Sequence, residues 1–129
     1  MANYNSFTTS NGFNVMNIDD FKKELQNVNG LDHFEFLNDG LVYVATYEGL
    51  YSTYYENNNE DEFEFEHEDY LKLIQKHMRD DQKVIVSSVG HEKLRYLTAD
   101  CSIITKDKIE FKNFFDYIKK KYNDNAYIF

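Results

Sequence analysis

The segment from residue 33 to residue 47 constrains the fold of this chain more than any other part. Two runs rich in apolar residues, 33–37 and 41–47, flank the tripeptide Asn38-Asp39-Gly40. Glycine adopts the positive φ that a tight hairpin turn requires. Successive side chains of a strand point to opposite faces. The second run therefore divides into two faces: Val42, Val44 and Thr46 against Tyr43, Ala45 and Tyr47. The sequence predicts an antiparallel hairpin here.

Three helices are indicated by apolar residues at helical spacing. The first is expected over 18–28, because Asn17 suits the N-cap and Gly30 lies just beyond the end. A second is expected over 69–79. A third is expected over 108–122, where Asp107 and Glu110 have the spacing of a capping box. Its apolar face would consist of Phe111, Phe114, Phe115, Ile118 and Tyr122.

Further strands are expected on both sides of the second helix. The turn at Ser10-Asn11-Gly12 would separate two short N-terminal strands, and a turn at Glu48-Gly49 would lead into a strand over 50–55. Later strands are expected over 83–89 and 93–99, joined by a turn at Gly90-His91, with 101–105 as a further strand or a continuation. This order predicts an α+β fold, a single domain over 1–129. Its largely antiparallel sheet would have about five to seven strands, with about three helices on one face.

Nearly all of the net charge of −9 lies between residues 56 and 69. This stretch has no Lys or Arg, and the rest of the chain has 15 acids against 14 bases, a balance of −1. The electrostatic field of so short an acidic stretch can be directed at a partner molecule. The eight acids are Glu56, Glu60, Asp61, Glu62, Glu64, Glu66, Glu68 and Asp69.

The conformation of the acidic stretch has two interpretations. As a strand, it would turn Phe63, Phe65 and His67 inward and Glu62, Glu64 and Glu66 outward in a row. As a helix, Asn59 would be its N-cap, Glu62 would complete a capping box, and Phe63 and His67 would begin an apolar stripe. A helix would leave Phe65 exposed, whereas a strand accounts for the strict alternation of acidic and aromatic residues. Both points favour the strand.

The outward row also has two interpretations. Charged residues commonly protect the edge of a sheet against aggregation. Alternatively, carboxylates about 6.6–6.8 Å apart along a strand are commensurate with phosphates, which rise about 3.4 Å per nucleotide. A basic groove built for nucleic acid would then accept the row. The preceding tyrosines would be aromatic anchors for such a partner: Tyr51, Tyr54 and Tyr55.

Composition argues against several other classes of function. The single cysteine, Cys101, fits a reducing compartment, and a polar N-terminus argues against a secretory signal, so we expect a cytoplasmic protein. An acidic chain is repelled by nucleic acid and by anionic membranes, so neither is expected to bind it. Residues 57–68 fit a calcium-loop template poorly, with Asn57 at its first position and Glu62 at its glycine position. We expect no metal and no cofactor.

In composition and charge layout, the chain resembles the small, acidic, tyrosine-rich α+β inhibitors that phages and mobile elements direct against nucleic-acid-binding proteins. That resemblance implies a non-enzymatic inhibitor that mimics nucleic acid and occludes a basic partner. An immunity or antitoxin-like protein that neutralises a basic toxin is the alternative. A small enzyme using His91 and Cys101 is a second alternative. Residues 1–69 carry −13 and residues 70–129 carry +4, which would allow head-to-tail self-association into a homo-oligomer.

Overall fold

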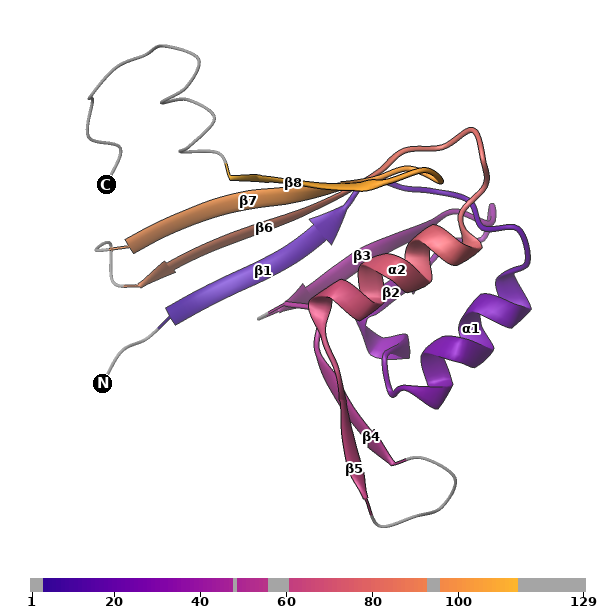
Figure 1. Cartoon of the computed structure of the whole chain (residues 1–129), viewed down its shortest axis with the longest axis horizontal. Coiled ribbons are helices and arrows are strands. Elements are labelled where there is room, and N and C mark those ends of the chain that lie inside the picture. Colours follow the sequence, from indigo (N-terminus) through magenta and orange to yellow (C-terminus); the bar gives the residue numbers. More distant parts are fainter. Residues whose placement is uncertain (1–3, 48, 56–60, 93–95, 114–129) are drawn as a thin grey trace.

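The computed structural model describes residues 4–47, 49–55, 61–92 and 96–113 (Figure 1). The elements follow in chain order: β1 (Tyr4–Ser10), α1 (Ile18–Asn27), a 3₁₀ turn (Leu31–His33), β2 (Phe34–Phe36), β3 (Val42–Tyr47), β4 (Ser52–Tyr55), β5 (Glu62–Phe65), α2 (His67–His77), β6 (Val84–Glu92), β7 (Tyr96–Ile104) and β8 (Ile109–Asn113). The α+β class is thus confirmed.

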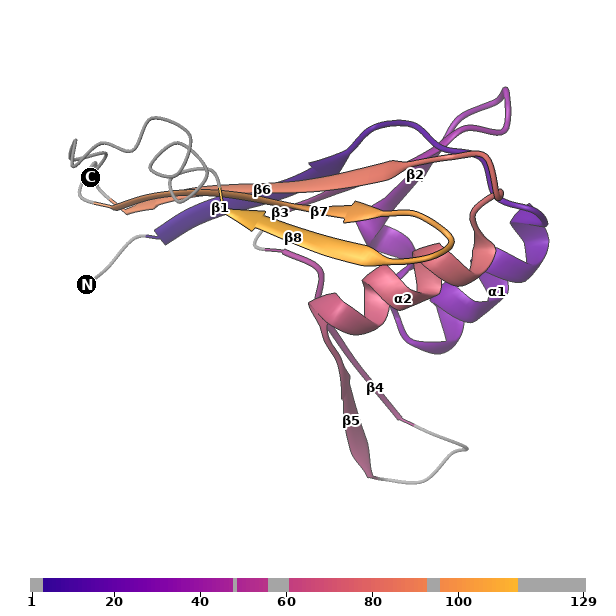
Figure 2. The ribbon, with the colours of Figure 1, turned by 45° about the horizontal axis from the view of Figure 1, so that its top comes forward.

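Six strands form one antiparallel sheet in the order β2-β3-β1-β6-β7-β8. Both helices lie on the same face of this sheet (Figure 2). The remaining strands, β4 and β5, form a separate two-stranded sheet that projects away from the domain in both views. Among the described residues, the hairpin contacts the rest of the domain at its base.

The core lies between the large sheet and the two helices. Phe21 of α1 is fully buried and meets the rings of Phe34 and Phe13 edge to face, at centroid distances of 5.4 Å and 6.4 Å. Such pairs add to the free energy gained by burying aromatic area. The sheet contributes the alternate residues of three strands: Val42, Val44, Val84, Val86 and Ile104.

Local signals in the sequence placed the first helix and the first hairpin correctly. The side chain of Asn17 caps α1 by accepting a hydrogen bond from the backbone N–H of Asp20 at 3.1 Å. Gly40 has φ of 89° in the turn between β2 and β3, and Asp39 Oδ1 accepts from the N–H of Leu41. Neither helix within the described ranges is long and apolar enough to cross a membrane.

The third helix was a wrong prediction over its first residues, because 109–113 form β8. The N–H of Thr105 donates to the carbonyl of Lys108, which closes a hairpin, and Ile109 then lies opposite Ile104. The carboxylate of Glu110 pairs with the ammonium of Lys108 rather than capping a helix. Ladder bonds and cross-strand pairs with β7 outweigh the local helical pattern. The remainder of the expected helix, 114–122, lies outside the described residues.

Two further expectations about strands were wrong. Gly90 and His91 lie inside β6, opposite Thr98 and Leu97, rather than in a turn. The N-terminal segment forms a single strand, β1, instead of two short ones, and it pairs with β3 and β6, which are distant in sequence. The strand expected over 50–55 forms as β4 and pairs with β5. Cys101 lies in β7, which continues to Ile104, as one of the two alternatives predicted.

The packing around Gly30 generates a test of the core. A Cβ at Gly30 would overlap the phenol ring of Tyr70, which is fully buried. We expect Gly30→Ala to lower the free energy of unfolding by about 2 kcal/mol, because overpacking displaces that ring. Urea unfolding measures the change. Gly12→Ala is the matched control: its Cβ would lie 3.5 Å from Leu41, so stability should change by less than about 0.5 kcal/mol.

Candidate functional site

The strands β4 and β5, with Asp61 directly before β5, form what we call the acidic hairpin (residues 52–55 and 61–65). Its antiparallel register places Tyr55 opposite Glu62 and Thr53 opposite Glu64. The alternate pairs lie on the other face: Tyr54 with Phe63 and Ser52 with Phe65. One face is thus acidic and tyrosine-rich, and the other is aromatic.

The acidic face is open to solvent. Glu62 and Glu64 are exposed, two residues apart on one strand, hence about 6.6–6.8 Å apart along it. Tyr55 is 61 % exposed and Tyr51 is 50 % exposed. The hydroxyl of Tyr51 donates to Glu64 Oε1 at 3.1 Å, which orients that carboxylate. Two of the three expected tyrosine anchors are therefore available to a partner on this face.

The aromatic face fixes the hairpin to the domain. Tyr54 packs on Phe63 with centroids 5.7 Å apart, so it is half-buried. Phe65 meets the ring of Tyr70 edge to face at 4.7 Å. At the base, the hydroxyl of Ser52 donates to the carbonyl of Val28 at 2.6 Å and also bonds to the hydroxyl of Tyr70. These contacts orient the base of the hairpin, and with it the acidic face.

A further hydrogen bond ties the hairpin to the end of α1. Asn29, which follows this helix, has φ of 56°, a conformation that asparagine tolerates better than most residues. Its side-chain amide donates to the carbonyl of Thr53 at 2.7 Å. The hairpin base is therefore bonded to the helix end as well as packed on α2.

Three of the predicted acids belong to the start of α2, and of these Asp69 was expected to be helical. Glu66 is the N-cap residue, and its N–H donates to Asp69 Oδ2 at 3.0 Å. Glu68 and Asp69 lie in the first turn, where the helix dipole favours negative charge. The row of three carboxylates was thus predicted wrongly at Glu66, and the helix capped by Asn59 and Glu62 does not form. Glu56 and Glu60 lie outside the described residues.

The ion pairs between described residues all lie away from the acidic face. Lys76 Nζ is 2.7 Å from Glu24 Oε1, which also lies 3.2 Å from His77 Nε2. The other pair joins Lys108 to Glu110. Burial acts to raise the pKa of Glu24, but the hydrogen bond from Lys76 and the nearby imidazole of His77 outweigh it, so the pKa is lowered. Within the part of the chain described, none of these pairs neutralises Asp61, Glu62 or Glu64.

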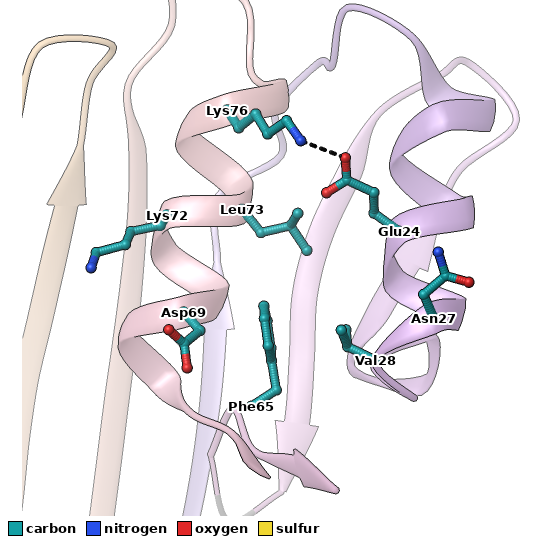
Figure 3. Close-up of a pocket in the computed structure, with 8 residues that line it drawn as sticks. All are labelled: Glu24, Asn27, Val28, Phe65, Asp69, Lys72, Leu73 and Lys76. Carbon is teal, nitrogen blue, oxygen red and sulfur yellow. Dashed lines mark hydrogen bonds and ion pairs between the residues drawn. The ribbon is translucent and has the colours of Figure 1, made fainter. Parts of the chain in front are cut away.

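One hollow lies beside the hairpin base, between the two helices, and we call it the helix hollow (Figure 3). It has a volume of about 450 Å³. Figure 3 shows Phe65 directed between the helices, with Leu73 from α2 and Val28 after α1 beside it. The charged groups around it have both signs: Glu24, Asp69, Lys72 and Lys76. It therefore has no strong preference for either charge.

A second hollow, of about 350 Å³, lies against the large sheet, and we call it the sheet hollow. Tyr51 lines it, so it adjoins the acidic face. His67 and Asp100 also line it. Burial lowers the pKa of His67, although Asp100 and Glu68 act to raise it. Burial raises the pKa of Asp100, and His67 opposes this.

Sequence reasoning missed the sheet hollow because its residues are far apart in the chain. The usable signal is a polar residue at a core-facing strand position, such as Ser88, two residues after the buried Val86. Finding the whole site also requires the register between β6 and β7, because that register places Ser88 opposite Asp100.

The alternative pair of His91 and Cys101 is not brought together along the sheet. Cys101 lies opposite Ser87, four positions before His91 on β6, which is about 13 Å along the strand. A nucleophile and its base need hydrogen-bond contact, so this spacing argues against that pair. Among the described residues, no group of three His, Cys, Asp or Glu side chains could hold a metal ion.

Comparisons with protein-family models, with curated proteins and with solved structures found no match to this chain. The function is therefore inferred below from the geometry and charge of the acidic hairpin.

The environment of His67 predicts how stability depends on pH. Its pKa is lower in the folded chain than the ordinary 6.5. As the pH falls, the imidazole of the unfolded chain is therefore protonated before that of the folded chain. The stability that the neutral ring contributes is complete above about pH 6.5 and is lost as the pH falls through the folded pKa. We expect His67→Gln to reduce the loss of stability between about pH 7.5 and about pH 5.5.

Urea unfolding of the wild type and His67→Gln at both pH values measures this difference. The window stays above the range in which most carboxylates titrate. Equal losses in the two proteins would contradict the assignment.

Proposed function

We propose that this chain is a non-enzymatic binding protein whose acidic hairpin engages a basic partner. The observation that carries the proposal is the exposed face on which Glu62 and Glu64 stand beside Tyr51 and Tyr55. The hairpin projects from the domain, so a partner can surround this face without meeting the large sheet first. Its carboxylates supply long-range attraction, and its tyrosines supply contact area.

The acidic residues fall into two groups, one at the start of α2 and one on the hairpin, and this distribution supports a binding role for the hairpin. Glu66, Glu68 and Asp69 stabilise the start of α2, which accounts for their presence. Glu62 and Glu64 have no such role, and their mutual repulsion would favour neutral residues there. A cationic partner offsets this repulsion, because each carboxylate gains a counter-charge on binding.

The partner class we propose is a basic nucleic-acid-binding protein, which the hairpin would occlude by mimicking nucleic acid. The spacing of Glu62 and Glu64, about 6.6–6.8 Å, is commensurate with the phosphates that such a groove accepts. Competition distinguishes this from neutralisation of a basic toxin: duplex DNA or RNA displaces a mimic from its partner, whereas a toxin-specific binder need not be displaced.

The acidic face makes a direct prediction about binding kinetics. The double variant E62Q/E64Q keeps the shape of the face and removes two charges. We expect its association with the partner to be about tenfold slower at low salt, and less dependent on salt, because electrostatic steering is lost. Partners are captured from lysate on the immobilised chain, purified, and measured by surface plasmon resonance over a salt series.

The matched control is D19N/D20N, which removes the same charge from the first turn of α1, on the domain rather than on the hairpin. It should associate almost as fast as the wild type. Equal rates for E62Q/E64Q and D19N/D20N would refute a role for the hairpin. Binding that duplex DNA does not displace would refute mimicry and favour the toxin-specific alternative.

A further inference from the structure

One row on the helix-facing side of the large sheet is polar on every strand that it crosses. Four consecutive cross-strand pairs join the polar residues of this row, which runs across β3, β1, β6, β7 and β8: Thr46, Thr8, Ser88, Asp100 and Asn113. The next row on this face holds Val86 and Phe111 as well as Ser10 and Ser102. The strands β1, β6 and β7 continue beyond the first turn of α2 (Figures 1 and 2). The polar row thus lies where the helical layer ends.

The sheet hollow opens on this row. Thr8 is only 2 % exposed, and its hydroxyl bonds to that of Ser88 at 2.9 Å. Asp100 follows on the next strand. The other walls combine aromatic and aliphatic groups, with Tyr51 and Phe111 among them and Leu50 and Val89 beside them. A volume of about 350 Å³ is within the range of small-ligand sites.

The charge in this hollow is negative at neutral pH. His67 is held in its neutral form by burial, since burial lowers its pKa from 6.5. The carboxylate of Asp100 is the remaining formal charge among the described residues that line the hollow. Burial disfavours that charge and raises its pKa, and the neutral ring of His67 supplies little compensation at neutral pH.

We propose that the sheet hollow receives one lysine or arginine side chain of the basic partner, with its cationic head beside Asp100. This inference rests on the proposed function and identifies which residue type of the partner confers specificity. The hydroxyl of Ser88 accepts a hydrogen bond from the guest, and the aliphatic stem packs on the aromatic wall. The rings of Tyr51 and Phe111 suit the flat face of a guanidinium.

The position of Tyr51 links the hollow to the hairpin. Its ring lines the hollow while its hydroxyl bonds to Glu64 of the acidic face. A basic segment lying along the acidic face therefore reaches the hollow without leaving the protein surface. An anionic guest would be repelled by Asp100 and by the acidic face together, so the hollow selects cations.

The test uses n-butylguanidinium, which matches the end of an arginine side chain, and its neutral analogue n-butylurea. We expect n-butylguanidinium to shift the backbone amide signals of residues around the hollow, such as Gly49 and Ser88, in a saturable way, with a dissociation constant of about 1–10 mM. The neutral analogue should bind about tenfold more weakly. Equal affinity for the two compounds, or no saturable shift, would overturn the proposal.

The variant Asp100→Asn keeps the shape of the hollow and removes its charge, so n-butylguanidinium should bind it about tenfold more weakly. Asp80→Asn, at an exposed acid beyond α2, is the matched control and should bind as the wild type does. Unchanged affinity in Asp100→Asn would contradict the assignment. The amide spectrum of each variant shows whether it is folded.

E62Q/E64Q separates this proposal from the proposed function, because the double variant should bind n-butylguanidinium as tightly as the wild type. If it also associates normally with the protein partner, the function proposed for the hairpin fails, while the cation site stands on the small-molecule result. If only the hairpin charges matter and Asp100→Asn has no effect, the cation site alone fails.

Discussion

The buried ring of Tyr70 is the contact on which the arrangement of the binding surfaces depends. It lies in the first turns of α2 and meets Phe65 of the hairpin at 4.7 Å, His33 at 5.5 Å and Phe34 at 6.2 Å. Its hydroxyl bonds to Ser52, and the missing Cβ of Gly30 leaves room for the ring. A rigid aromatic ring with a satisfied hydroxyl can join two hairpins and a helix in one geometry. The acidic hairpin therefore has a fixed base, although within the described ranges no third strand pairs with it.

The acidic residues of this segment meet two different physical requirements. Near α2, carboxylates complete the helix N-terminus, where unpaired N–H groups and the dipole favour negative charge. On β5, carboxylates occupy the solvent side of a strand whose opposite side must be apolar to pack on Tyr70. Alternation satisfies both faces of the strand with one short sequence, Glu62-Phe63-Glu64-Phe65. The same pattern that fixes the hairpin thus creates the surface that we assign to binding.

Much of the local structure was predictable because its causes are local. Asn17 caps the helix that begins at the next residue, Gly40 makes the turn in which it lies, and the alternation over 62–65 requires no partner to be recognised. The sequence also located the negative field and two of the exposed tyrosines. Glu66 was misassigned because its alternation continues the strand pattern, whereas the start of α2 at His67 converts it to a cap.

The sequence by itself determined the first helix, the turn at Gly40 and the positions of the charges, since short-range sterics and side-chain periodicity act within a few residues. Tertiary structure decided the features that depend on contacts between segments distant in sequence. Pairing with β7 made a strand of 109–113, despite a helical pattern, because ladder bonds and cross-strand packing outweigh propensity. The register of β1, β6 and β7 brought Thr8, Ser88 and Asp100 side by side. Register is set by contacts between distant segments, so the sheet hollow exists only in the folded chain.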